Sequence, residues 1–227
     1  MNYILPDGLG DAVLGYPIIK KLAESRETTV QTKYPEIFSH IHNVTAVTTK
    51  ISGHQIRYPM RGGDLSHYEE MCKAARIAPP PFTMPANSMK IPDGKAICVI
   101  KEPCAAHMHK AARDFTFTPR LEAMQEYINA HQDKYAFISV GVDEVFHGRL
   151  TGVIDMANKL TVAGLLSLVA ASAKVVTQIG HLVPIAQAFA KDLVVFESPN
   201  NTGRFKRITA EKVSTPQRLG GTLEVYK

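Results

Sequence analysis

A strand, a glycine-rich turn and a helix at the N-terminus limit the possible folds most strongly. The short apolar run Asn2–Leu5 leads into the sequence D-G-L-G-D at residues 7–11, and Leu14, Ile18 and Leu22 then recur on one helix face. Glycines allow a tight turn and a close backbone approach, and a helix N-terminus offers free N–H groups to an anion. This order predicts a ligand-binding edge of a parallel α/β sheet.

The alternation of strand and helix continues along the chain. The segments that we expect to be regular are the strands Thr28–Lys33, Val44–Thr48, Ala96–Ile100, Tyr135–Val140, Lys174–Thr177 and Leu193–Phe196, and the helices Tyr34–His40, Arg120–His131, Val162–Ala173 and His181–Ala190. Five prolines crowd Ala78–Gly94, which therefore reads as a linker. We predict an α/β fold of two lobes, 1–93 and 94–227, with parallel sheets and helices on both faces.

Composition excludes several classes of protein and favours an anionic partner. The 227 residues include three cysteines and carry a net charge of +5. Sparse cysteines, no apolar run of about 20 residues and no signal-peptide pattern at residues 1–6 lead us to expect a cytoplasmic protein without a membrane span. Residues 201–227 hold six basic and two acidic side chains. That basic segment is either a solvated face or a contact for nucleotide phosphates, nucleic acid or an acidic surface.

Asp11 has two interpretations. At the carboxyl edge of a sheet it can act as a general base, if a substrate hydroxyl comes within hydrogen-bond reach. It can also serve only as the N-cap of the following helix. The turn does not complete the dinucleotide pattern G-x-G-x-x-G, because Val13 stands where the third glycine belongs.

A second strand–turn–helix lies at residues 174–190. Gly180 and His181 begin its helix directly after a buried strand, which predicts a second phosphate-binding turn, with helix capping by His181 as the alternative. Lys101, Lys110 and Arg113 on an earlier loop could also bind phosphate. Four possible metal ligands share that region, but their spacing fits no structural zinc pattern, so we predict no metal site; they are Cys98, Cys104, His107 and His109.

These segments together resemble the heptosyltransferase-like glycosyltransferases, the ADP-heptose:lipopolysaccharide heptosyltransferase family. Gly10–Leu22 matches that family's Gly-Asp turn, its proline and its amphipathic helix. Further matches lie in the second lobe, at Leu150-Thr151-Gly152, Leu160–Ala173, Lys174–Phe189 and Leu193–Pro199. The resemblance covers most of the chain at the level of motifs.

The resemblance implies a GT-B fold, in which two Rossmann-like lobes enclose a nucleotide-sugar donor held mainly by the C-terminal lobe. It implies that Asp11 is the base and that Arg113, in Arg113-Asp114-Phe115, stabilises the leaving diphosphate. No cofactor beyond the donor and no metal are implied. The residues expected at the donor or its phosphates are Gly8, Gly10, Lys101, Gln178, Gly180, His181 and Glu197.

We therefore predict a metal-independent glycosyltransferase that moves a sugar from a nucleotide sugar to an acceptor hydroxyl. The acceptor is either a lipopolysaccharide core sugar or a hydroxylated nucleic-acid base. The chain departs from the family at its Asp-Thr/Ser-Gly donor turn, which here reads Gln178-Ile179-Gly180. Two alternatives stay open: a non-catalytic nucleotide-binding module of the same fold, and a nucleic-acid-binding protein that uses the basic C-terminal segment.

Overall fold

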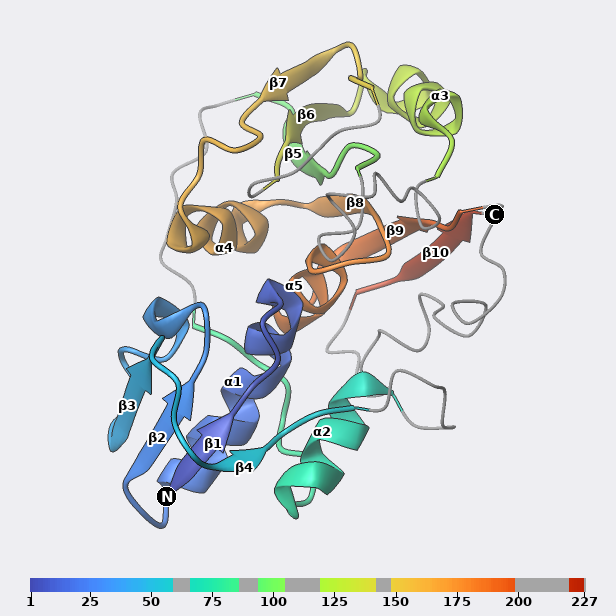
Figure 1. Ribbon diagram of the computed structural model, residues 1–227. Coiled ribbons are helices and arrows are strands. Elements are labelled where there is room, and N and C mark those ends of the chain that lie inside the picture. Colours follow the sequence, from blue (N-terminus) through green and yellow to red (C-terminus); the bar gives the residue numbers. More distant parts are fainter. Residues whose placement is uncertain (59–65, 86–93, 105–118, 142–147, 199–220, 227) are drawn as a thin grey trace.

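The computed structural model describes residues 1–58, 66–85, 94–104, 119–141, 148–198 and 221–226. Two parallel sheets organise these residues (Figure 1). The strands are β1 (Asn2–Ile4), β2 (Thr28–Gln31), β3 (Val44–Val47), β4 (His54–Gln55), β5 (Ala96–Ile100), β6 (Tyr135–Ser139), β7 (Val153–Asp155), β8 (Lys174–Gln178), β9 (Asp192–Phe196) and β10 (Leu223–Tyr226). The helices are α1 (Leu9–Ala23), α2 (His67–Ala75), α3 (Leu121–His131), α4 (Val162–Ala171) and α5 (Leu182–Ala188), with a 3-10 turn, η1, at Pro35–Ile37.

The first sheet has the strand order β3-β2-β1-β4 and the second β10-β9-β8-β5-β6-β7. Every pair of neighbours in both sheets is parallel. The carboxyl ends of the strands in each sheet therefore meet at one edge, where α/β proteins bind their ligands. The predicted α/β class with parallel sheets is confirmed.

Side chains alternate between the two faces of β5, and both faces are buried. Ile97 and Val99 join a hydrophobic cluster that includes α1, α4 and α5, whereas Cys98 and Ile100 pack with α3. Helices on both faces explain why the strands are nearly continuous apolar runs. The first cluster also contains residues of the first sheet, so one core extends across both sheets.

The first residues of the predicted linker Ala78–Gly94 are packed against the rest of the protein. Phe82 is 1% exposed and joins the main core, while the Tyr68 hydroxyl donates to the Pro80 carbonyl at 2.6 Å. The first part of the predicted linker is therefore packed against α2. Residues 86–93 lie outside the described residues, and the boundary between 93 and 94 stays a prediction.

Several predicted elements begin or end elsewhere. The helix expected at Tyr34–His40 is only the three-residue η1, because Phe38 bonds back to Pro35 and Ile41 to Phe38, in a 3-10 pattern. α4 stops at Ala171, because Ser172 adopts an extended conformation and its hydroxyl bonds the Val169 carbonyl. The remaining shifts are small: β2 ends at Gln31, β3 at Val47 and β6 at Ser139, β8 extends to Gln178, α3 begins at Leu121, and α5 spans Leu182–Ala188.

The sequence interpretation missed α2 and the short strands β4, β7 and β10. α2 begins with a capping box: the Ser66 hydroxyl accepts from the Glu69 N–H at 3.3 Å, and the Glu69 carboxylate accepts from the Ser66 N–H at 2.8 Å. The S-x-x-E pattern of residues 66–69 is the signal that could have identified this helix. Among the described residues, no helix has the length and apolarity needed to cross a membrane.

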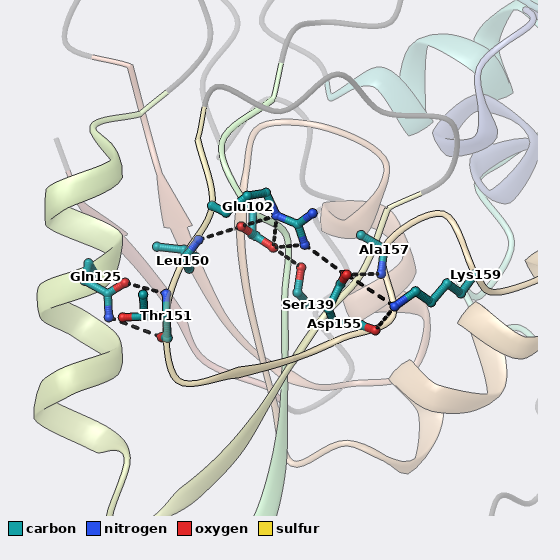
Figure 2. Close-up of polar contacts among 9 residues, drawn as sticks. Glu102, Gln125, Ser139, Leu150, Thr151, Asp155, Ala157 and Lys159 are labelled. Atoms are coloured by element: carbon teal, nitrogen blue, oxygen red, sulfur yellow. Dashed lines mark hydrogen bonds and ion pairs between the residues drawn. The ribbon is translucent and has the colours of Figure 1, made fainter.

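A buried carboxylate joins three strand ends at the edge of the second sheet (Figure 2). Glu102 is fully buried after β5 and accepts hydrogen bonds from the Ser139 hydroxyl at the end of β6 and from the Leu150 N–H at 2.7 Å. The Arg149 guanidinium lies 3.0 Å from Glu102 and 2.8 Å from Asp155, which ends β7. The network fixes the carboxyl ends of β5, β6 and β7 relative to one another. These ends lie at the sheet edge where we expect the donor to bind.

Glu102→Gln should therefore lower the free energy of unfolding by about 1.5–3 kcal/mol, the usual loss when a hydrogen-bonded charge is removed. Lys159→Ala is the control, because Lys159 and Asp155 form an exposed pair at 3.3 Å, worth at most about 1 kcal/mol. Urea unfolding of both variants measures the difference. Equal losses of unfolding free energy in the two variants would contradict the claim that the buried network stabilises the fold more than the exposed pair does.

Candidate functional site

Asp11 lies in the first turn of α1 and is not its N-cap. Gly8 is the N-cap, the helix begins at Leu9, and Asp11 is the third helical residue. Its carboxylate lies against the backbone of Gly8. The capping interpretation is thus corrected in its geometry: the side chain reaches back to the N-cap, as the acidic member of a capping box does. Pro17 lies inside α1.

Gly8 is needed because the Asp11 carboxylate lies against it. A Cβ atom at position 8 would collide with the Asp11 Oδ2. The glycine therefore serves the placement of the carboxylate, and the sequence interpretation had assigned it to the donor. The contact of Gly8 with the donor stays a prediction.

Burial raises the pKa of the Asp11 carboxyl above its usual value of 3.8, because it disfavours the charged form. Hydrogen bonds from the Tyr58 hydroxyl and from the N–H groups of Gly8 and Asp11 itself oppose this rise, and the negative charge of Asp7 adds to it. A carboxylate with a raised pKa is a stronger base than an ordinary surface aspartate. Asp11 is therefore suited to accept a proton.

The two predicted turns lie next to each other. A Cβ atom at Gly10 would be 3.2 Å from the His181 Cα and 3.5 Å from the Pro184 Cγ, so the missing side chain of Gly10 lets α1 approach α5 closely. Figure 1 shows the N-terminal end of α1 next to α5. This contact places Asp11, one residue further along α1, beside the start of α5.

Lys101 and His181 form the polar group on the other side of this contact. Lys101 follows β5, is only 4% exposed, and has its Nζ 3.4 Å from the His181 Nδ1. The Lys101 ammonium has only donors, so the His181 Nδ1 accepts. A Cβ atom at Gly180 would have the Lys101 Nζ at 3.7 Å as its nearest neighbour. Lys101, Gly180 and His181 thus lie together in the structure, and their contact with a donor phosphate stays a prediction.

His181 is the N-cap of α5, but its side chain makes no capping hydrogen bond. The alternative prediction, that the His181 imidazole caps the helix, is therefore wrong. α5 itself has only seven residues, so its dipole is short. A phosphate beside this turn would be held mainly by the side chains of Lys101 and His181.

Gln178 has a different part from the one expected. It is 2% exposed, its Oε1 accepts from the Cys104 N–H at 3.1 Å, and its Nε2 donates to the Cys104 carbonyl at 3.0 Å. Both ends of the amide are thus used to fix the chain that leaves β5. Gln178 helps to position that chain, and its amide is already bonded where the resemblance implied a donor contact.

The remaining predicted residues divide into described and undescribed ones. Glu197 follows β9 at the same sheet edge, and its N–H donates to the Tyr226 carbonyl at 2.8 Å. Arg113, Lys110, His107 and His109 lie outside the described residues, so their parts stay predictions. Within the described ranges, no group of three or more His, Cys, Asp or Glu side chains is placed to hold a metal ion.

The sequence interpretation missed Tyr58. This residue comes after β4, a strand of two residues, and its hydroxyl is the largest influence that lowers the pKa of the Asp11 carboxyl. The two residues are far apart in sequence, and no motif links them. Only the parallel pairing of β4 with β1 brings them together.

No protein-family model matches the chain, and no curated protein sequence matches it. Solved structures do match its fold. TibC, an iron-containing dodecameric glycosyltransferase from enterotoxigenic E. coli H10407, superposes with a TM-score of 0.64 at 10% identity. The match covers 88% of this chain and 61% of TibC, so this chain spans about three fifths of the length of TibC.

Two further structures match this chain over a larger share of their own length. E. coli ADP-heptose lps heptosyltransferase II matches with a TM-score of 0.60 at 12% identity, over 98% of this chain and 89% of that protein. A glycosyl transferase family 9 protein from Veillonella parvula DSM 2008 matches with a TM-score of 0.64 at 8% identity, over 99% and 85%. With its two parallel sheets, the chain has the Rossmann-like α/β fold of the heptosyltransferase-like glycosyltransferases.

Proposed function

We propose that the protein is a metal-independent glycosyltransferase that transfers a sugar from a nucleotide-diphosphate donor to an acceptor hydroxyl. The observation that carries the proposal is the packing of Gly10 against His181, which brings the helix turn that contains Asp11 next to the turn that contains His181 and its partner Lys101. A base and a group that binds a leaving diphosphate are the two parts that the reaction needs.

In the proposed reaction, Asp11 accepts the proton of the acceptor hydroxyl, and the hydroxyl oxygen forms a bond to the anomeric carbon of the donor. The bond from that carbon to the diphosphate oxygen breaks, and its electron pair leaves with the diphosphate. Lys101 and His181 donate to the diphosphate oxygens and stabilise the charge that develops there. Arg113, carried over from the resemblance, would add a second cation.

The similar structures support a nucleotide-sugar donor. TibC was solved in complex with ADP-D-β-D-heptose, and E. coli WaaC with ADP-2-deoxy-2-fluoro heptose. We therefore propose an ADP-linked sugar as the first donor to try. A lipopolysaccharide core sugar and a hydroxylated nucleic-acid base remain the two proposed acceptors.

The direct test is incubation with a panel of nucleotide-diphosphate sugars, with and without each acceptor, while release of nucleoside diphosphate and transfer of sugar are measured by mass spectrometry. Transfer to either acceptor is the expected result. Binding of donors without hydrolysis or transfer would instead support the non-catalytic module, which the replaced donor turn at Gln178 favours.

Lys101→Met should weaken nucleoside-diphosphate binding about ten- to a hundredfold, because a charge-assisted hydrogen bond is worth roughly 1.5–3 kcal/mol. Calorimetric titration with ADP measures the change. Lys174→Met is the matched control, since Lys174 begins β8 at the opposite edge of the same sheet and pairs with Glu224 at 3.5 Å. Unchanged ADP affinity in a folded Lys101→Met protein would remove Lys101 from the site.

Asp11→Asn should abolish transfer and leave donor binding intact, because an amide cannot accept the proton and base catalysis of about 10²–10⁴-fold is lost. The variant should not lose stability at neutral pH. Since burial raises the pKa of Asp11 in the folded protein, the ionised carboxylate costs stability as the pH rises above 3.8 through the folded value, and the neutral amide avoids that cost.

Turnover assays, calorimetry and thermal unfolding of Asp11→Asn at pH 7 measure these three properties together. A variant that binds the donor and turns over at the wild-type rate would show that Asp11 only supports the first turn of α1. A variant that melts well below the wild type would mean that the carboxylate is chiefly structural.

A further inference from the structure

The Gln178 side chain joins the two chain segments that carry Lys101 and His181. Its Oε1 accepts from the Cys104 N–H at 3.1 Å, and its Nε2 donates to the Cys104 carbonyl at 3.0 Å. The amide thus pairs with both backbone groups of one residue, as a residue on a neighbouring strand would. Both partners are almost completely buried, so water does not compete for these bonds.

These contacts close a polar ring, which consists of the segments Lys101–Cys104 and Gln178–His181. At one end of the ring the Gln178 amide bonds the Cys104 backbone. At the other end the Lys101 Nζ lies 3.4 Å from the His181 Nδ1. Only two residues separate the ends along each segment, so the Gln178 bonds limit how far the other end can open.

The sheet holds the start of the same segment. The Lys101 N–H donates to the Val176 carbonyl at 2.9 Å, which continues the pairing of β5 with β8 beyond the end of β5. The next residue, Glu102, accepts from the Leu150 N–H at 2.7 Å through its buried carboxylate. The backbone on both sides of the Lys101 side chain is therefore fixed, and the Gln178 bonds fix the chain beyond Glu102.

We propose that Gln178 is a positioning residue, which acts through the Cys104 backbone to hold the Lys101 ammonium against the His181 turn, where it meets the donor diphosphate. The inference rests on the proposed glycosyltransferase function. A long lysine side chain that is ordered before binding needs no further ordering when the ligand arrives, and such preorganisation raises affinity. Gln178 thus contributes to donor binding although its amide is already bonded within the protein.

Gln178→Met tests this role, because it keeps the length of the side chain and removes both hydrogen-bonding atoms. Calorimetric titration with ADP should show an affinity lower by about three- to tenfold, since binding must then order the Lys101 side chain. In a Lys101→Met background the same substitution should change the ADP affinity by less than about twofold, because Gln178 acts through Lys101. An equal fall in both backgrounds would show a general structural effect and would overturn the inference.

Gln125→Met is the matched control. The Gln125 amide pairs with the Thr151 backbone in the same two-point manner, with its Oε1 accepting at 2.8 Å and its Nε2 donating at 3.3 Å (Figure 2). It lies on α3, which packs against the other hydrophobic cluster from α1 and α5. Gln125→Met should leave the ADP affinity unchanged, and a fall equal to that of Gln178→Met would overturn the inference.

Gln178→Asn is the second variant, for use if Gln178→Met does not fold. Its amide can still bond the buried Cys104 backbone, but it is one methylene shorter, so the segment Lys101–Cys104 must shift to meet it. The ADP affinity should fall in the same direction as in Gln178→Met, and again only where Lys101 is present. An unchanged ADP affinity in folded Gln178→Asn would overturn the inference.

The NMR signals of the His181 ring give a readout that needs neither ADP nor turnover. Lys101→Met supplies their position in a protein whose His181 has lost its lysine neighbour. The signals should move toward that position in Gln178→Met or Gln178→Asn and stay at the wild-type position in Gln125→Met. Unmoved His181 signals in a folded Gln178 variant would overturn this inference alone. Failure of the wild type to bind ADP or to transfer a sugar, with the His181 signals still moved, would overturn the proposed function alone.

Discussion

The close contact between α1 and α5 is the constraint on which the site depends. Gly10 has no side chain, so the first turn of α1 can lie against the backbone of His181, with only 3.2 Å between the position of a Cβ and the His181 Cα. A Cβ atom at this position would require the two helices, which pack in one shared core, to move apart by a few tenths of an ångström. The glycine that is typical in sequence of a phosphate-binding turn is in the structure a packing glycine between α1 and the start of α5.

This contact places groups of opposite chemistry next to each other. On one side, burial raises the pKa of Asp11 and makes it a stronger base, while the Tyr58 hydroxyl and the Gly8 backbone oppose that rise. On the other, the buried ammonium of Lys101 lies beside His181. The proposed transfer of a sugar requires one group to take a proton and another to receive negative charge, and the contact between α1 and α5 brings the two turns that carry these groups next to each other.

Local sequence signals predicted the parts of the fold that depend on local physics. The apolar strands, the glycine turns at 8–10 and 180, and the helix of α1 were recognisable because each follows from a pattern within some fifteen residues. The short strands β4, β7 and β10 were missed, since two to four residues that are stabilised by pairing carry little pattern of their own.

The residues of the candidate site were harder to predict, because some of their contacts form only between segments that are distant in the sequence. Asp11, Lys101 and His181 could be found because each follows a recognisable strand or turn. Tyr58 could not, because its contact with Asp11 exists only after β4 has paired with β1. Gln178 resembled a donor contact by its place in a motif, yet hydrogen bonds to the distant Cys104 commit its amide to holding the chain.

A crystal structure with ADP, or with an unreactive ADP-sugar, tests the central claim most directly, because that claim concerns where one diphosphate lies. We predict the diphosphate within hydrogen-bond distance of the Lys101 Nζ and the His181 ring, with the sugar on the side of Asp11. A diphosphate bound elsewhere, with Lys101 and His181 still bonded only to each other and to protein, would contradict the account.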